Sequence, residues 1–95
     1  MIESWAEKYR PKKIEDVVAQ KLFDNGLTLA VAESCTGGYI SKKLTDISGS
    51  SSYFKGSIVA YDNSIKENFL DISAKFLIDK GAVSSDTAIK MAENI

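Results

Sequence analysis

The sequence predicts an α/β fold, and more closely a partial three-layer α/β/α sandwich built on a short, mainly parallel sheet. Two short apolar runs, at 27–33 and 53–61, have the length and composition of strands. A segment with helical apolar spacing lies between them, as in a strand–helix–strand unit whose strands run parallel. The other apolar segments repeat at helical spacing and are flanked by capping residues, so helices are expected to outnumber strands.

The first part of the chain divides into a polar arm, 1–13, and the start of an α/β domain that we assign to 14–95. The arm interleaves Trp5 and Tyr9 with charged residues, and Pro11 prevents one unbroken helix through it. A helix follows, because its apolar side chains recur at the spacing of an amphipathic stripe. These side chains are Ile14, Val17, Val18, Leu22 and Phe23. Asn25-Gly26 is typical of a helix end.

The middle of the chain carries the predicted strand–helix–strand unit. The apolar run at 27–33 is interpreted as a buried strand, and it is followed by a tight turn and a helix over about 38–45. A loop at 46–52 leads to the second strand, which is strongest at 57–61. In such a unit the carboxyl ends of the two strands lie side by side.

The last third predicts three short helices. The first runs from the turn at 62–64 to about Leu70, the second is capped by Ser73 and closed by Gly81, and Ser84 or Ser85 caps the third. The side chains expected to face inward are Ile65, Phe69 and Leu70 in the first of these helices, and Ala88, Ile89, Met91, Ala92 and Ile95 in the last.

The number of strands is low for this fold class. Two parallel strands rarely form a viable sheet alone, because parallel sheets are normally buried on both faces. We therefore expect that a partner chain completes the sheet or that the chain is part of a longer protein. A homo-oligomer is the expected state.

Composition excludes several kinds of chemistry. The 95 residues contain no histidine and one cysteine, Cys35, which excludes Ser-His and Cys-His pairs and an internal disulfide. No metal site and no cofactor are expected. The net charge of −1 makes nucleic acid an unlikely partner. The lack of a membrane-spanning run or a signal-peptide core, with the cysteine usage, predicts a soluble cytoplasmic protein.

Three side chains are predicted to meet beyond the carboxyl ends of the two strands. Ser34 ends the first strand, Tyr61 ends the second, and Lys66 lies about one turn into the next helix. A lysine whose charged form is disfavoured by burial can activate a serine as a nucleophile, and ligands bind at this edge of open α/β sheets. Backbone N–H groups of Cys35 and Thr36 would then form an oxyanion hole.

Each of these residues also has an interpretation without chemistry. The turn residues, 34–36, would only cap a helix, Tyr61 would be a core residue, and Lys66 would be a solvated lysine. Glu33 would be a solvated strand end or would pair with Lys42 or Lys43. Gly37-Gly38 fits neither of the common phosphate-binding glycine motifs.

Several motifs along the chain resemble the C-terminal domain of the CinA family, the nicotinamide-nucleotide amidases. They lie in the family's order and spacing at 32–38, 44–51, 53–56, 59–66 and 81–84. The resemblance implies a serine amidohydrolase that converts nicotinamide mononucleotide to nicotinic acid mononucleotide and ammonia. A pyridine nucleotide is thus the small-molecule partner that the resemblance implies.

The resemblance also assigns residues. The family's nucleophile falls on Ser34, its lysine and tyrosine fall on Lys66 and Tyr61, and Ser51 matches a serine of the substrate pocket. Together with the turn geometry, this places oxyanion or substrate contacts at Cys35, Thr36, Gly37 and Gly38. The family's domain continues well beyond the segment matched here, which favours an alternative function: a truncated, non-catalytic module that oligomerises or binds a partner.

Residues 5–20 also resemble, weakly, the start of clamp-loader small subunits. Those proteins continue into a phosphate-binding loop of the Walker A type, and this chain has none, so ATPase function does not follow. Arg10, Lys12 and Lys13 could contact nucleic acid beside Trp5 and Tyr9, but a solvated arm is the expectation.

Overall fold

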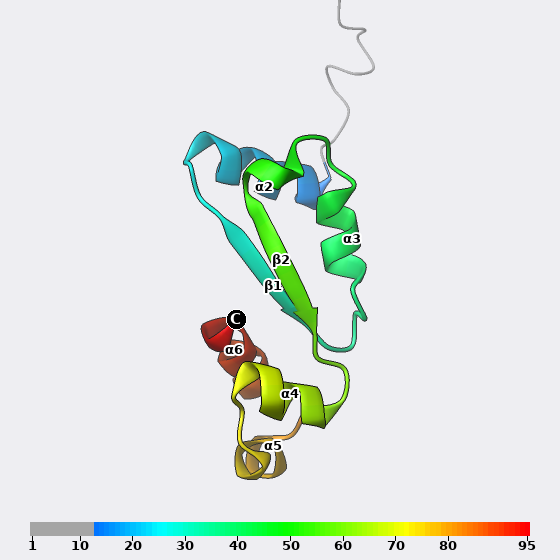
Figure 1. The fold of residues 1–95 in the computed structure, drawn as a ribbon, viewed down its shortest axis with the longest axis vertical. Coiled ribbons are helices and arrows are strands. Elements are labelled where there is room, and N and C mark those ends of the chain that lie inside the picture. Colours follow the sequence, from blue (N-terminus) through cyan, green and yellow to red (C-terminus); the bar gives the residue numbers. More distant parts are fainter. Residues whose placement is uncertain (1–12) are drawn as a thin grey trace, which may run out of the picture.

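A computed structural model describes residues 13–95, and Figure 1 shows its fold. In chain order the elements are α2 (Ile14–Asp24), β1 (Leu29–Glu33), α3 (Tyr39–Thr45), the 3-10 helix η1 (Ser50–Ser52), β2 (Phe54–Val59), α4 (Asn63–Leu70), α5 (Ala74–Lys80) and α6 (Ser85–Asn94). Every helix and strand predicted from the sequence is present within a few residues of its expected ends. Residues 1–12 of the predicted arm, Trp5 and Tyr9 among them, lie outside the described residues. Its last residue, Lys13, is described.

The two strands form the predicted parallel pair. Val31 lies opposite Ser57, and Glu33 lies opposite Val59. The backbone N–H of Ala60, just past β2, donates to the carbonyl oxygen of Glu33 at 2.7 Å. The last residues of β1 and the chain just after β2 are therefore bonded to each other, which brings the turns that follow the two strands to one edge.

Helices cover the two faces of this sheet unequally. Helix α3 contacts both strands, and α2 packs beside α3. On the other face, Ala32 and Ile58 pack against the core formed by α4, α5 and α6 and the segments joining them, while Ala30 is exposed. That core consists of Ala60, Leu70, Ile72, Leu77 and Met91. The α/β class is thus confirmed, and the second face is covered only near the carboxyl end of the strands.

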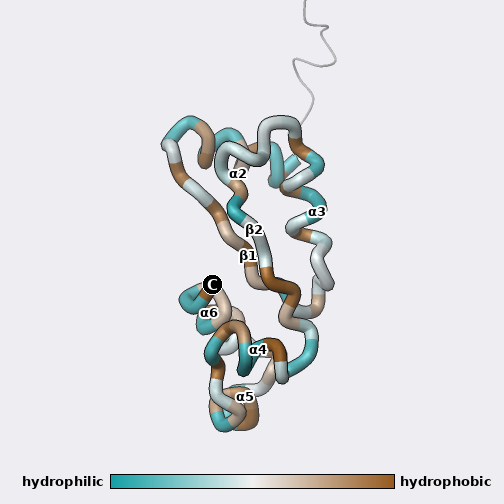
Figure 2. Tube along the Cα trace, viewed as in Figure 1, coloured by the Kyte–Doolittle hydropathy of each residue, from teal (hydrophilic) through white to brown (hydrophobic). Residues whose placement is uncertain are grey.

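The hydropathy of the trace follows this arrangement. Figure 2 shows hydrophobic segments along both strands toward the edge where α4, α5 and α6 gather. Capping explains why the last helices begin where they do: Ser73 accepts a hydrogen bond from Phe76 N at 3.0 Å, and Ser84 accepts one from Thr87 N at 3.1 Å. Of the two serines considered for the last cap, Ser84 is therefore the one used.

Some side chains predicted to face inward are exposed. Phe69 is 65% exposed and Ile89 is 57% exposed, and in α2 only Ala19 is buried. In α6 the polar Thr87 takes an inward position instead, because its hydroxyl donates to the carbonyl of Gly81 at 2.6 Å. The helical spacing was predicted correctly, but which part of each stripe is covered depends on the neighbouring helices.

Candidate functional site

The turn between β1 and α3 is closed by two glycines in the left-handed region. Gly37 has φ 59° and Gly38, which precedes α3, has φ 102°. Gly37 N donates to the carbonyl of Ser34 at 3.0 Å, so the chain reverses within four residues. Ser34 itself is half-buried, directly after the last residue of β1. The turn therefore holds the serine at the carboxyl edge of the sheet, as the sequence predicted.

Glu33 corrects one prediction from the sequence. It was expected to be a solvated strand end or to pair with Lys42 or Lys43, yet it is 2% exposed. Lys42 instead forms an ion pair with Asp46, and the ammonium of Lys43 lies over the ring of Tyr39. The carboxylate of Glu33 points into the start of α3 because residues of that helix supply its hydrogen-bond donors.

Four hydrogen bonds satisfy this buried carboxylate. Oε1 accepts from the hydroxyl of Thr36 at 2.7 Å and from Ile40 N at 2.9 Å. Oε2 accepts from Ser41 N at 3.0 Å and from the hydroxyl of Ser41 at 2.5 Å. Burial alone raises the pKa of Glu33, but these bonds, led by the Ser41 hydroxyl, outweigh it and lower the pKa to about 2. Glu33 is therefore ionised at neutral pH.

The turn leaves other amides available. Within the described residues, neither Cys35 N nor Thr36 N donates to a protein acceptor, and both residues are exposed. At the start of α3, by contrast, Glu33 occupies the amides of Ile40 and Ser41. The amides of Cys35 and Thr36 are therefore among the donors that an incoming oxyanion would find at this turn.

Lys66 is buried at the other side of the same edge, and it is 1% exposed. Its side-chain nitrogen Nζ donates to the carbonyl of Ala60 at 2.7 Å and to the carbonyl of Tyr61 at 3.2 Å. Helix α4 places Lys66 there, because Asp62 caps that helix by accepting from Ser64 N at 2.9 Å. The solvated lysine considered from the sequence is thus wrong for this residue.

One residue, Ala60, links the serine turn to the lysine. Ala60 N bonds to the carbonyl of Glu33, and Ala60 O accepts from Lys66 Nζ. Ser34 is the next residue after Glu33, so two hydrogen bonds separate its backbone from the lysine amine. No hydrogen bond joins the Ser34 hydroxyl to Lys66 among residues 13–95.

Tyr61 and Ser51, two other predicted site residues, are both exposed. The Tyr61 side chain is 73% exposed, and what reaches Lys66 is its backbone carbonyl. Ser51 is exposed in η1, which precedes β2, so it lies at the amino end of the strand. Within the described part of this chain, Ser51 is therefore at the opposite end of the sheet from Ser34.

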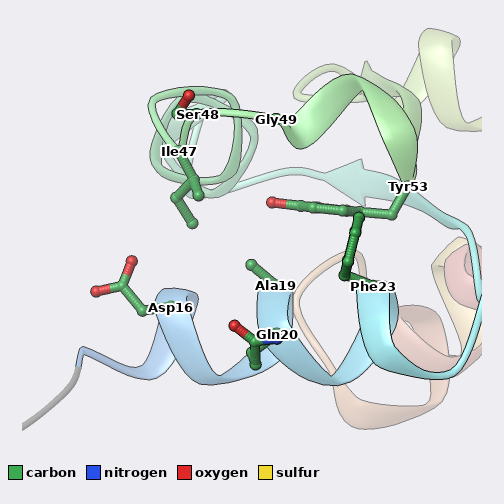
Figure 3. Close-up of a pocket in the computed structure, with 8 residues that line it drawn as sticks. All are labelled: Asp16, Ala19, Gln20, Phe23, Ile47, Ser48, Gly49 and Tyr53. Atoms are coloured by element: carbon green, nitrogen blue, oxygen red, sulfur yellow. The ribbon is translucent and has the colours of Figure 1, made fainter.

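The structure also contains a cavity that the sequence did not reveal. It measures about 370 Å³ and lies between α2 and the loop before β2 (Figure 3). Its lining residues are Asp16, Ala19, Gln20, Phe23, Ile47, Ser48, Gly49 and Tyr53. The Tyr53 hydroxyl is buried there without a hydrogen-bond partner in the described part of the chain. Because this cavity is at the amino end of the sheet, it is separate from the Ser34 turn.

Fold and geometry together define an α/β protein with a candidate serine–lysine site at the carboxyl edge of a parallel sheet. A family model described as the CinA C-terminal domain matches residues 11–95. The chain therefore belongs to the CinA C-terminal domain family.

Individual relatives agree with this assignment. A putative competence-damage inducible protein from Desulforamulus reducens is 55% identical over 84 residues, which are 88% of this chain and 20% of that protein. A CinA-like protein from Amoebophilus asiaticus is 43% identical over 95 residues, all of this chain and 23% of that protein.

Solved structures share the fold. A competence-damaged protein (CinA) superfamily protein from Enterobacter cloacae aligns with a TM-score of 0.81 and 32% identity, over 100% of this chain and 57% of that one. A competence/damage inducible protein from Agrobacterium tumefaciens aligns with a TM-score of 0.80 and 38% identity, over 84% of this chain and 48% of that one. The chain spans about a fifth of the length of the curated relatives and about half that of the solved structures.

Among residues 13–95, no helix is both long and apolar enough to cross a membrane.

Proposed function

We propose that the domain is an amidohydrolase that releases ammonia from the carboxamide of nicotinamide mononucleotide, with Ser34 as the nucleophile and Lys66 as the base. The substrate class comes from the family resemblance. The supporting observation in the structure is the setting of Lys66, a buried amine at the edge where Ser34 lies.

The two acceptors of Lys66 suit the role of a base. A neutral amine has two N–H groups and one lone pair, and the carbonyls of Ala60 and Tyr61 take up the two N–H groups. The lone pair then remains for the proton of a serine hydroxyl. A lysine held only to balance a buried charge would instead be expected to meet a carboxylate, and no carboxylate bonds to Lys66 within residues 13–95.

The proposed reaction has two halves. In the first, Ser34 Oγ attacks the carboxamide carbon, its proton passes to Lys66, and the carbonyl oxygen becomes an oxyanion at the amides of Cys35 and Thr36. Collapse of this intermediate breaks the C–N bond, and the leaving nitrogen takes a proton from Lys66 and departs as ammonia. In the second, water cleaves the acyl-serine, with Lys66 again accepting and returning a proton, and the acid product leaves.

Two further residues, Tyr61 and Ser51, are assigned by the family resemblance. The family resemblance gives the Tyr61 phenol a part in proton transfer to the leaving nitrogen, whereas the observed contact of Tyr61 to Lys66 is made by its backbone carbonyl. Ser51 lies at the opposite end of this chain's sheet from Ser34, so its proposed role as a pocket residue rests on the family resemblance. A homo-oligomer is proposed as the working form. The exposed apolar side chains on α4, α5 and α6, such as Phe69, Ile78 and Ile89, favour such an assembly.

The test is ammonia release from nicotinamide mononucleotide by the purified protein and its Ser34→Ala variant. We expect turnover that the substitution abolishes, and a Ser34-linked acyl adduct that rapid quenching and mass analysis detect in the parent protein. Cys35→Ala is the matched control, because it changes the neighbouring side chain but keeps the backbone amide of residue 35. Equal ammonia release by the parent and Ser34→Ala would refute the proposal.

A further inference from the structure

We propose that Glu33 is a positioning residue of the site: its side chain ties the turn that contains Ser34 to α3, and its backbone carbonyl ties that turn to Ala60, the residue whose own carbonyl holds Lys66. This role rests on the proposed function for its catalytic consequence. The geometry itself is independent of the reaction.

The side chain of Glu33 leaves the turn little freedom. A carboxylate offers about four lone-pair sites, and here two donors bond to each oxygen. One donor, Thr36, belongs to the turn, and the others, from Ile40 and Ser41, belong to the first helical turn of α3. The carboxylate therefore braces both ends of the segment that contains Ser34.

The same bonds determine which amides remain for the substrate. Ile40 N and Ser41 N would be the natural anion donors at a helix start, and Glu33 occupies both. Cys35 N and Thr36 N keep no protein acceptor in the described residues. Glu33 thus removes two amides of α3 from the available donors and leaves those of the turn, Cys35 N and Thr36 N among them.

The backbone of Glu33 connects the turn to the base. Its carbonyl accepts from Ala60 N at 2.7 Å, and Ala60 O accepts from Lys66 Nζ at 2.7 Å. Ala60 is fully buried, so this link is shielded from solvent. A shift of Glu33 would move the serine relative to the amine, and a misplacement of about 1 Å can lower a rate roughly 10²-fold.

The kinetic test compares Glu33→Gln and Ser41→Ala with the parent protein in ammonia release. Glutamine keeps the size of the side chain but offers a single oxygen acceptor, and Ser41→Ala removes one donor without changing the charge. We expect kcat to fall roughly 10²-fold for Glu33→Gln and about tenfold for Ser41→Ala, with KM within twofold. The control is Ser73→Ala, which removes the cap of α5 away from the turn and should leave kcat unchanged.

A second readout does not require turnover. Cys35 is the sole cysteine, is exposed, and lies in the turn itself, so its rate of reaction with a thiol reagent reports how well the turn is held. We expect the rate to change at least threefold in Ser41→Ala and in Glu33→Gln, and to stay at the parent value in Ser73→Ala. Ser41→Ala is decisive if Glu33→Gln does not fold, because it leaves the carboxylate in place.

The outcomes separate this inference from the proposed function. If the parent protein releases no ammonia but the thiol rates change as expected, the function fails and the bracing of the turn stands. Unchanged thiol rates in both variants would overturn the inference whatever the activity. In an active protein, changed thiol rates with an unchanged kcat would show a structural cap and would also overturn the positioning role.

Discussion

Two buried ionisable residues lie at the same edge of the sheet, and their hydrogen-bonding groups are satisfied in different ways. Glu33, at the end of β1, has both oxygens filled by four donors from its own turn and from α3. Lys66, in α4, donates to two carbonyls and forms no ion pair among the described residues. A side chain whose hydrogen-bonding positions are all used holds the structure in place. A side chain that keeps one such position unused is available for chemistry. This contrast separates the positioning role from the catalytic one.

The largest expected effect comes from removing the amine. Lys66→Met keeps the apolar length of the side chain but removes the base, so ammonia release should fall by about 10³-fold or more. The measurement is kcat at saturating nicotinamide mononucleotide. Lys75→Met, on an exposed position of α5, is the matched control and should retain parent activity. Near-parent turnover by Lys66→Met would show that Lys66 is not the base.

Acid should reveal the stabilising contribution of Glu33. Its folded pKa of about 2 lies below the ordinary value of 4.5, so its contribution is present above about pH 4.5 and is lost as the pH falls toward 2. The difference between these two pKa values corresponds to about 3 kcal/mol of unfolding free energy at neutral pH. Urea unfolding of the parent and Glu33→Gln at pH 7 and pH 3, at one protein concentration, measures it.

In that experiment the two proteins should differ most at pH 7 and converge as the solution is acidified. The other carboxylates, Asp62 among them, are common to both proteins and cancel in the comparison. A gap in stability that stays constant between pH 7 and pH 3 would show that the charge of Glu33 is not what stabilises the turn.

A change in the backbone conformation of the turn should lower stability less than removal of the Glu33 carboxylate does. Gly38 has φ 102°, and an added Cβ would meet Val59 Cγ2 at 3.6 Å, an ordinary contact. Gly38→Ala therefore brings backbone strain without a clash, and it should lower stability by about 1–2 kcal/mol. Gly26→Ala, at φ 63° after α2, is a control for the same strain away from the site. Only Gly38→Ala should also change the thiol reactivity of Cys35.

The sequence predicted one of these two charged residues better than the other. Local spacing sufficed to place Ser34 and Lys66 after neighbouring parallel strands, because strand order and helix length fix those positions. It did not predict the setting of Glu33, whose donors lie three to eight positions later and converge only once Gly37 and Gly38 reverse the chain. The exposure of Phe69 and Ile89 was missed for a similar reason: periodicity identifies an apolar stripe but not what covers it.

The smallest expected effect comes from Tyr61. A substitution there distinguishes what its phenol contributes to the reaction from what its backbone carbonyl contributes by bonding to Lys66. If the carbonyl of Tyr61 is its main contribution to Lys66, Tyr61→Phe keeps that contact and kcat should fall by less than about threefold. A phenol that relays a proton to the leaving nitrogen would instead be worth 10²-fold or more, the usual range for general acid catalysis. Steady-state ammonia release over a range of pH distinguishes the two, because loss of a relay would also change the shape of the pH profile. A large loss in Tyr61→Phe would mean that the exposed ring turns toward the edge in the working protein, and that Lys66 does not act alone.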